Sequence, residues 1–420
     1  MAGYVSGVAS RDIAPHSDDA LLDWVQRQTL DYFWSFAHPA SGMARERSNP
    51  VPGYDYLETV TSGGTGFGIM ALIAGASRGF LPLAAVRERI RKIVAFLGRA
   101  ERHHGVFSHF LHGGTGAAIP FSEWDDGGDL VETAFLMAGL LCARQFFTGR
   151  TPDDADLRND IDRLWHAVEW AWHTQGDDAL YWHWSPRYGW DMDHAITGWN
   201  ECLITFVLAA ASPTHPIAPS VYHRGWTNSS TFRNGESYFG VKLPLGPPHG
   251  GPLFFSQYSF LGLDPRGLCD RYADYWEQNR AHALINRAHC IANKNGFTGY
   301  GVNCWGLTAC DGDAGYGVFS PTNDHGVIAP TAALSAIPYT PHESMDVLRH
   351  LCELDGARSR FGFVDALNMS RHWYAGSNLA IDQGPIAVMI ENYRTGLLWD
   401  LFMSCPSVGE GLSRLDFERH

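Results

Sequence analysis

The chain has 420 residues, of which 45% are hydrophobic and 18% are charged. This ordinary globular balance excludes an intrinsically disordered protein. The formal net charge is −14 and the few lysines form no basic run, so neither nucleic acid nor an anionic membrane is an expected partner. A polyanionic substrate is equally disfavoured, which leaves a neutral ligand. The 15 tryptophans are enough to line a sugar cleft.

The eight cysteines are scattered and form no CxxC pair. Cys142 and Cys202 lie in apolar segments, so we expect reduced thiols and no structural disulfide. Residues 1–19 lack a basic region followed by an apolar core, so no signal peptide is predicted, and no segment is long and apolar enough to span a bilayer. The sequence as given predicts a cytoplasmic protein, whereas a chain trimmed of an export signal would be periplasmic.

Two kinds of helix alternate along the first half of the chain. One kind is apolar nearly all round and must be buried on every side, and the other carries a single apolar stripe that covers a core. The apolar helices are expected at residues 66–78, 129–147 and 195–211. The covering helices between them are expected at residues 82–100 and 155–173.

This alternation predicts an inner ring of helices inside an outer ring. The predicted inner helices begin near Gly66, Asp129 and Ile196, at steps of 63 and 67 residues, and a near-constant step indicates repeated helical hairpins. The closed solution is an all-α (α/α)6 toroid with over half of its residues helical, and an open helical bundle or solenoid is the alternative. A chain of this length suggests two domains by default, but a toroid accounts for residues 1–420 as one domain.

The second half of the chain is richer in loops. Residues 213–262 contain many prolines and glycines and are expected to form a long excursion over one mouth of the toroid, with a short hairpin. A helix is expected at 265–294, after an Asp-Pro cap. Residues 296–328 form a Gly-rich loop, and long loops in a compact domain are usually functional. The last helices are expected at 343–355 and 381–395.

The segment WDDGGDLVE holds the densest group of acidic residues. Asp125, Asp129 and Glu132 stand at i, i+4 and i+7, so on one helix they would fall within about 60° of arc. The two intervening glycines could instead leave Asp125 on a loop. Asp129 fits an N-cap, and capping is its simplest role. Glu132 heads an apolar helix, where an unpaired charge is costly, so a structural role explains it less well.

Glu201 is the lone ionisable residue in the apolar segment 195–211. A carboxyl group in apolar surroundings has a raised pKa and suits a general acid, although a buried glutamate paired with an arginine is the alternative. One proton donor and one ionised carboxylate are the minimum set for glycoside hydrolysis. We therefore predict that Glu201 protonates the leaving oxygen. A carboxylate among Asp125, Asp129 and Glu132 would activate water, with Glu132 ionised near a positive helix end.

Other motifs are weaker. Four histidines lie between residues 103 and 112, but their spacing matches no zinc motif, so neither a metal nor an organic cofactor is predicted. The chain has no serine-hydrolase elbow, dinucleotide fingerprint or P-loop. Sugar contacts are guessed from polar and aromatic residues in loops and near helix starts: Arg45, Glu46, Arg47, His104, Trp190, Asn303 and Trp305.

Segments spread in order over nearly the whole chain resemble glycoside hydrolase family 144 and the wider glucoamylase-like group. These segments are RERS (45–48), TSGGTGFGIMAL (61–72), DDGGDLVETAFL (125–136), YWHWSPRYGW (181–190), GWNECLI (198–204), QYSFLGLDPRG (257–267), GYGVNCWGLTA (299–309), VIAPTAALSAIPY (327–339), GFVDALN (362–368) and IDQGPIAVMIENYRTGLLW (381–399).

The resemblance implies an (α/α)6 toroid that acts on β-1,2-glucan or on sophoro-oligosaccharides with inversion of the anomeric centre. Members of the group are endo-acting, or exo-acting with release of sophorose. The resemblance also implies that Asp125, Asp129, Glu132 and Glu201 are the functional acids and that Glu201 is the general acid. It leaves the identity of the base open.

Two rival functions fit the same residues. The first is a transferase on the same fold that passes glucosyl units to a sugar acceptor, and the sequence does not distinguish water from sugar as the acceptor. The second is a non-catalytic glucan-binding protein, but binding alone has no use for a buried acid. The sequence gives no indication of the oligomeric state.

Overall fold

The computed structural model describes residues 17–420. The prediction that residues 1–19 contain no signal peptide concerns mainly residues 1–16, which lie outside the described residues. In the described part, no helix is long and apolar enough to cross a membrane.

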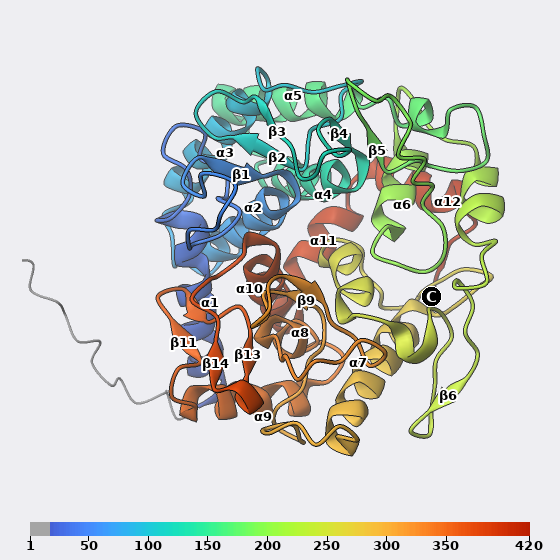
Figure 1. The fold of residues 1–420 in the computed structure, drawn as a ribbon. Coiled ribbons are helices and arrows are strands. Elements are labelled where there is room, and N and C mark those ends of the chain that lie inside the picture. Colours follow the sequence, from blue (N-terminus) through green and yellow to red (C-terminus); the bar gives the residue numbers. More distant parts are fainter. Residues whose placement is uncertain (1–16) are drawn as a thin grey trace, which may run out of the picture.

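An inner ring of helices surrounds the axis of the molecule (Figure 1). Helix α2 packs against α4 and α10, α6 packs against α4 and η5, and α10 also contacts η5 and α8, so the ring closes on itself. Its members are α2 (Ser62–Ser77), α4 (Leu130–Phe146), α6 (Leu203–Ala211), η4 (Leu253–Ser256), η5 (Tyr258–Leu261), α8 (Pro330–Leu334) and α10 (Ala380–Thr395). The closed ring confirms the predicted toroid and excludes the open bundle.

An outer layer covers this ring. Helix α1 packs on α2 and α10, α3 on α2, α5 on α4, α7 on η4 and α9 on α8. The single-turn π-helix η2 covers α6 through Trp226, whose ring stacks on Phe206 at 4.9 Å. The outer members are α1 (Asp18–Trp34), α3 (Leu83–Leu97), α5 (Pro152–His166), η2 (Val221–Trp226), α7 (Tyr275–Ala292) and α9 (Pro341–Glu353).

Helices α2 and α4 approach each other through glycines. A Cβ on Gly139 would lie 2.2 Å from the carbonyl oxygen of Gly66, and a Cβ on Gly66 would lie 2.2 Å from the carbonyl oxygen of Phe135. Only glycine therefore allows the two backbones to touch here. Such contact, together with the apolar character of α2 on all sides, explains why this helix is buried along almost its whole length.

Two C-terminal helices complete the molecule. Helix α11 (Leu397–Met403) follows directly on the C-terminal end of α10 and contacts α2, α4, α10 and η5, so it closes that end of the ring. Figure 1 shows it near the middle of the toroid. The buried Trp399 anchors it, because its indole nitrogen donates to the carbonyl oxygen of Phe260 at 2.7 Å. Helix α12 (Pro406–Arg414) packs against α6.

Short antiparallel ladders decorate the loops between the helices. Three of them border the site described below: β1 (Thr59–Thr61) with β2 (Phe110–His112) and β3 (Ala118–Ile119), β4 (Gly128–Asp129) with β5 (His183–Trp184), and β9 (Ala309–Cys310) with β10 (Gly317–Val318). The others are β6 (Ser237–Tyr238) with β7 (Val241–Lys242), β8 (Leu268–Cys269) with β15 (Glu418–Arg419), β11 (Arg358–Ser359) with β12 (Gly362–Phe363), and β13 (Leu367–Asn368) with β14 (Trp373–Tyr374). The β6–β7 ladder is the short hairpin expected within residues 213–262. Three further 3-10 helices are η1 (Trp170–Thr174), η3 (Pro248–Gly250) and η6 (Met369–Arg371).

Four predicted helix boundaries are wrong. The first inner helix begins at Ser62, four residues before Gly66. The third inner helix begins at Leu203 instead of Ile196. The helix predicted at 155–173 ends at His166, where α5 stops and a 3-10 turn takes over. The helix predicted from residue 265 begins at Tyr275, because Asp274 caps it.

The carboxylate of Asp264, expected to cap that helix, instead binds Arg266 and Arg419. The structure is 46% helical, so the prediction that over half of the residues are helical is wrong. The shortfall reflects the long loops and ladders between the inner and outer helices.

Candidate active site

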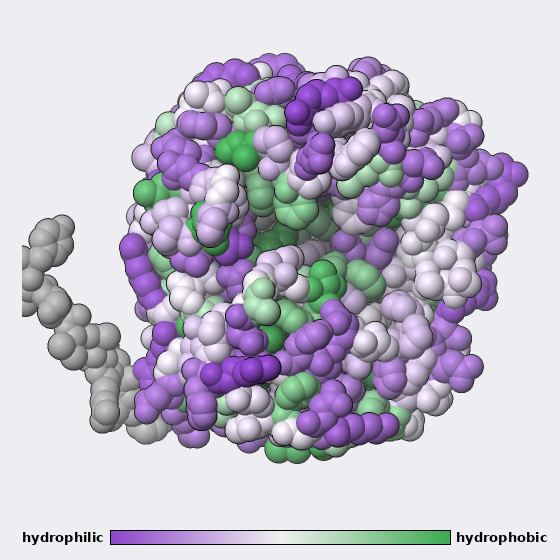
Figure 2. All heavy atoms as spheres, in the orientation of Figure 1, coloured by the Kyte–Doolittle hydropathy of each residue, from purple (hydrophilic) through white to green (hydrophobic). Residues whose placement is uncertain are grey.

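A pocket opens where the inner helices α2, α4, α6 and α10 begin. Its volume is about 370 Å³. Figure 2 shows a hollow near the centre of this face, with apolar residues around it. Aromatic rings form much of its wall, and two of the four predicted functional acids, Glu132 and Glu201, reach into it. The lining residues are Glu46, Arg47, Tyr54, Thr61, His109, Phe110, Pro120, Phe121, Glu132, Phe135, Trp182, Glu201, Phe254, Tyr258, Ala309, Tyr316, Val318, Leu379 and Ile381.

Asp129 begins α4 and orients the residues around it. Its Oδ1 accepts hydrogen bonds from the amides of Val131 and Glu132, at 3.0 and 2.9 Å, which makes it the N-cap as predicted. The same oxygen accepts from the indole of Trp182 at 3.0 Å. In the β4–β5 ladder Asp129 pairs with His183, so the local strand register places this histidine beside the cap.

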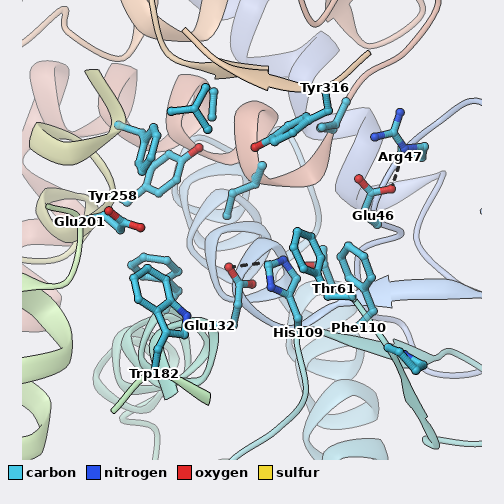
Figure 3. Close-up of a pocket in the computed structure, with 18 of the residues that line it drawn as sticks. Glu46, Arg47, Thr61, His109, Phe110, Glu132, Trp182, Glu201, Tyr258 and Tyr316 are labelled. Carbon is cyan, nitrogen blue, oxygen red and sulfur yellow. Dashed lines mark hydrogen bonds and ion pairs between the residues drawn. The ribbon is translucent and has the colours of Figure 1, made fainter. Parts of the chain in front are cut away.

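Glu132 projects from the first turn of α4 into the pocket (Figure 3). Its Oε2 accepts a hydrogen bond from the amide of Gly63 at 2.8 Å, and its Oε1 lies 3.9 Å from Nε2 of His109. Burial raises the pKa of this carboxyl group, while the neighbouring His109 and the Gly63 amide oppose the rise. The environment of Glu132 is therefore less favourable to charge than its place near a helix N-terminus suggested.

Glu201 lies in the turn before α6, not on the helix as the apolar pattern suggested. The hydroxyl of Ser259 donates to the carbonyl oxygen of Glu201 and accepts from the amide of Ile204, which fixes the turn against η5. Burial raises the pKa of the Glu201 carboxyl to about 8, and the negative charges of Glu132 and Asp129 add to the rise. The side chain projects into the pocket from a different inner element than Glu132 (Figure 3).

Asp125 and Asp129 are buried behind the pocket and do not line it. Asp125 lies on the loop before α4, with its Oδ1 3.2 Å from Nδ1 of His183. Asp129 is fully buried, with its Oδ2 bound to Nδ1 of His109 at 3.1 Å. Burial raises the pKa of Asp129, but the hydrogen bond from His109 and the nearby His183 outweigh it and lower the pKa overall. The four predicted acids are thus brought together, in two layers: Glu132 and Glu201 in the pocket, Asp125 and Asp129 beneath it.

Among residues 17–420, two groups of side chains bring metal-ligating atoms together. His109, Asp125 and Asp129 do so beside the pocket. There the oxygens of Asp129 already accept from two amides, an indole and an imidazole, so the group is better described as a hydrogen-bond network. The second group, Cys269, Glu418 and His420, lies on the β8–β15 ladder. The side chains of Glu418 and His420 are each 73% exposed and pair with each other at 3.5 Å, as surface ion pairs do.

A further acidic group borders the pocket on the side of α10. Arg47 lies between Glu46 and Asp311, with N–O distances of 2.9 and 3.1 Å. Behind them, burial raises the pKa of Asp365 to about 7, and burial together with Asp365 raises that of Asp382 well above its usual value. Both deeper carboxyl groups therefore keep their protons to a higher pH than an ordinary aspartic acid does. Asp311, Asp365 and Asp382 were not among the residues predicted for the site.

Of the seven guessed sugar contacts, Glu46 and Arg47 line the pocket. The guanidinium of Arg45 instead binds the carbonyl oxygens of Phe36 and Leu57. The remaining four also lie outside the pocket lining. His104 stacks on Trp172 at 3.6 Å, Trp190 packs against Trp172, Asn303 is exposed, and Trp305 is completely buried in the core. Their positions do not support direct contact with a sugar in this pocket.

Several lining residues were not among the predicted catalytic or substrate-binding residues. Trp182, Tyr258 and Tyr316 bring aromatic surface and polar tips to the pocket, and His109 faces Glu132. Trp182, Tyr258 and Asp382 lie within segments that carry the family resemblance, so those segments held the available signal. Tyr316 and His109 come from loops outside those segments, where no periodicity points to a site.

Comparisons with known proteins agree with this architecture. The family model described as "Putative glucoamylase" matches residues 193–406. The exo β-1,2-glucooligosaccharide sophorohydrolase (non-reducing end) of Parabacteroides distasonis is 42% identical over 98% of this chain. The chain spans 60% of the length of that curated relative.

Solved structures are similarly close. A glucoamylase-like protein from Bacteroides uniformis is 56% identical, with a TM-score of 0.94 over 96% of this chain and 98% of its own. The endo-β-1,2-glucanase of Chitinophaga pinensis, solved with sophorotriose and glucose, is 50% identical, with a TM-score of 0.93 over 96% of this chain and 99% of its own. The chain therefore belongs to the glucoamylase-like family that its sequence resembles, glycoside hydrolase family 144.

Proposed function

We propose that this protein is a glycoside hydrolase that cleaves β-1,2-glucan or sophoro-oligosaccharides by an inverting acid/base mechanism. The observation that carries the proposal is the meeting of Glu201 and Glu132 in one aromatic-lined pocket (Figure 3). Glu201 is held protonated near neutral pH, because its pKa is about 8. Glu132 has an amide donor and a histidine beside it, so it is the pocket carboxyl that ionises more readily.

The two carboxyl groups divide the chemistry between them. Glu201 donates its proton to the glycosidic oxygen as the bond to the anomeric carbon breaks, so the leaving sugar departs as a neutral alcohol. Glu132 takes a proton from a water molecule that attacks the same carbon from the opposite face. Attack from the opposite face inverts the anomeric configuration.

Asp125 and Asp129 would act through their neighbours, because neither reaches the pocket. Asp129 fixes the start of α4 and thereby the direction of Glu132. Asp125 holds His183 beside it. We therefore assign the direct acid and base roles to Glu201 and Glu132, and positioning roles to Asp125 and Asp129.

The walls of the pocket suit a neutral sugar. Trp182, Tyr258 and Tyr316 offer aromatic faces for stacking on pyranose rings, and Glu46 with Arg47 offers polar groups for hydroxyls. The relatives named for β-1,2-linked substrates support the linkage. We also propose one catalytic domain for residues 1–420, because α10 packs against α2 and so joins the two halves of the chain.

The test is incubation of the protein with linear β-1,2-glucan and with sophoro-oligosaccharides, followed by mass analysis of the products. We expect shorter β-1,2-linked products, with the product lengths reporting endo or exo action. A β-1,3-glucan is the linkage control and should remain uncut. Parallel reactions with added glucose separate hydrolysis from transfer, since a transferase would make extended products that depend on the acceptor.

A variant pair tests the assignment of the base. Glu132→Gln keeps the shape of the side chain but cannot take a proton, so turnover should fall by roughly 10²-fold or more. Glu277→Gln makes the same change at an exposed position on the outer helix α7 and should be unaffected. Near-normal turnover by Glu132→Gln would remove Glu132 from the mechanism and leave Glu46 as the next carboxyl group on the pocket lining to test as the base.

A further inference from the structure

His109 stands between the two layers of acidic residues. Its Nδ1 is bound to Oδ2 of Asp129 at 3.1 Å, and its Nε2 lies 3.9 Å from Oε1 of Glu132. The ring stacks on Phe121, with centroids 4.3 Å apart and planes 17° apart. One histidine thus contacts the carboxylate beneath the pocket with one nitrogen and faces the pocket carboxylate with the other.

We propose that His109 is a positioning residue that keeps Glu132 in its ionised form and aimed into the pocket, with Asp129 as the anchor of the imidazole. The inference rests on the proposed function, in which Glu132 is the base. In this proposal Asp129 holds His109, and His109 in turn acts on Glu132. Glu132 is the member of the three that contacts the reacting water.

The hydrogen bond to Asp129 determines the tautomer of the His109 imidazole. A carboxylate at Nδ1 selects the form with a proton on that nitrogen, which leaves Nε2 directed at Glu132. If Nε2 also carries a proton, the ring is a cation between two carboxylates. Burial lowers the pKa of His109, but the attraction of Glu132 and the hydrogen bond to Asp129 outweigh this effect and raise the pKa to about 9. The ring is therefore charged throughout the range in which Glu201 holds its proton.

A cation here offsets the burial of Glu132. Without it, Glu132 would be a buried carboxyl group with only the Gly63 amide in its favour and with Asp125 and Asp129 opposing its charge. Such a group takes up a proton more readily and is a weaker base at a given pH. The other titratable group in this cluster, His183, lies against Asp125 and Asp129, and it does not face Glu132.

The pH dependence of turnover separates this role from a purely structural one. His109→Gln and His109→Asn remove the charge, and the asparagine amide can still donate to Asp129. In both variants the acid limb of kcat/KM should move to higher pH, because Glu132 then protonates at higher pH as the solution is acidified. His183→Gln is the matched control: it removes a buried histidine of the same network and should leave the acid limb near the wild-type position.

A second measurement does not depend on activity. Proton–carbon NMR spectra of ¹³C-histidine-labelled protein, with the His109 signal assigned by its loss in His109→Gln, report the titration of the ring directly. We expect a midpoint near 9 in the wild type, from the raised pKa, and a lower midpoint in Glu132→Gln, which removes the facing charge.

These readouts distinguish the possible failures. A His109 signal that titrates at the same pH with and without the Glu132 charge would overturn the inference, whatever the enzyme does to glucan. So would an acid limb that stays in place in both His109 variants, or one that His183→Gln moves equally. A wild type that titrates as expected but leaves every glucan uncut would sink the proposed function while preserving the charge relationship between His109 and Glu132. Circular dichroism of each variant checks that it is folded.

Discussion

The amide of Gly63 and the carboxylate of Glu132 are in direct contact, although 69 positions separate them in sequence. The hydrogen bond is 2.8 Å long, and a Cβ on Gly63 would lie only 2.5 Å from Oε2 of Glu132. The start of α2 therefore both binds the pocket carboxylate from α4 and limits where it can lie. A glycine is needed here for the space that it leaves, since a larger residue would occupy the position of the carboxylate.

Gly63→Ala should therefore reduce turnover without unfolding the protein. The new methyl group displaces the end of a flexible side chain instead of backbone, so the cost falls on the position of Glu132. A displacement of about 1 Å at a reacting group can cost up to about 10²-fold in rate. The measurement is kcat on β-1,2-glucan, with thermal melting as the check on folding. Gly409→Ala, where a Cβ meets nothing within 4 Å, is the control and should match the wild type in kcat.

Glu201→Gln should lower turnover of unactivated glucan by roughly 10²-fold or more, because the amide keeps the shape of the side chain but cannot donate the proton. Binding of a sophoro-oligosaccharide, measured by calorimetry, should survive. Substrates with a leaving group that needs no protonation should lose far less activity. Normal turnover of unactivated glucan by this variant would remove Glu201 from the mechanism.

Activity should fall as the pH rises through about 8, the pKa to which burial raises Glu201. The sign follows from its role: a general acid works only while protonated, which is the form present below its pKa. The check is the pH profile of kcat/KM under conditions in which the protein stays folded. Activity that continues to rise between pH 7 and 9 would contradict the assignment of Glu201 as the acid.

The product should have inverted anomeric configuration. Inverting glycosidases place their two carboxyl groups about 6.5–9.5 Å apart, to leave room for the water, whereas retaining ones place them about 5–5.5 Å apart. Proton NMR of the first products, recorded before mutarotation, distinguishes the outcomes: the cut β-linkage should yield the α-anomer. Early appearance of the β-anomer would mean retention and a covalent intermediate.

Gly139→Ala should destabilise the toroid by about 1–3 kcal/mol, as inserting atoms into a packed core does. The sign of the change in stability tests the packing, because alanine in place of glycine within a helix ordinarily stabilises by roughly 0.5–1 kcal/mol. At Gly139 the added Cβ would meet the backbone of Gly66, whereas at Gly409 in α12 it would meet nothing. Chemical denaturation of the two variants should give shifts of opposite sign, and a stabilised Gly139→Ala would show that α2 and α4 separate easily.

The sequence predicts the ring of helices well, because apolar residues on all sides of α2 and α4 leave burial as the only stable outcome. It also identifies Glu132 and Glu201 as anomalies, since a charge in an apolar segment is costly. It predicts the start of α6 poorly: Gly198 takes a positive φ of 77°, and a hydrogen bond from Ser259, far along the chain, fixes a turn before Leu203 where a helix was expected.

The rest of the site depends on contacts that no local pattern records. Trp305 is of a residue type that stacks on sugars, yet it is buried in the core, whereas Trp182, directly before β5, lines the pocket. Which tryptophan faces the pocket is decided by how the loops fold over the ring. The role of His109 likewise depends on the fold, which places Asp129 and Glu132 on either side of its ring.

The position of α11 determines from which side substrate can reach the pocket. Because this helix contacts α2, α4, α10 and η5 at the end of the ring remote from the pocket, protein covers that end of the ring within residues 17–420. We therefore expect substrate to enter and product to leave on the side where the pocket opens. The departing product and the incoming glucan chain would then compete for the same opening. Turnover on long chains should therefore depend on how quickly the first product leaves the pocket.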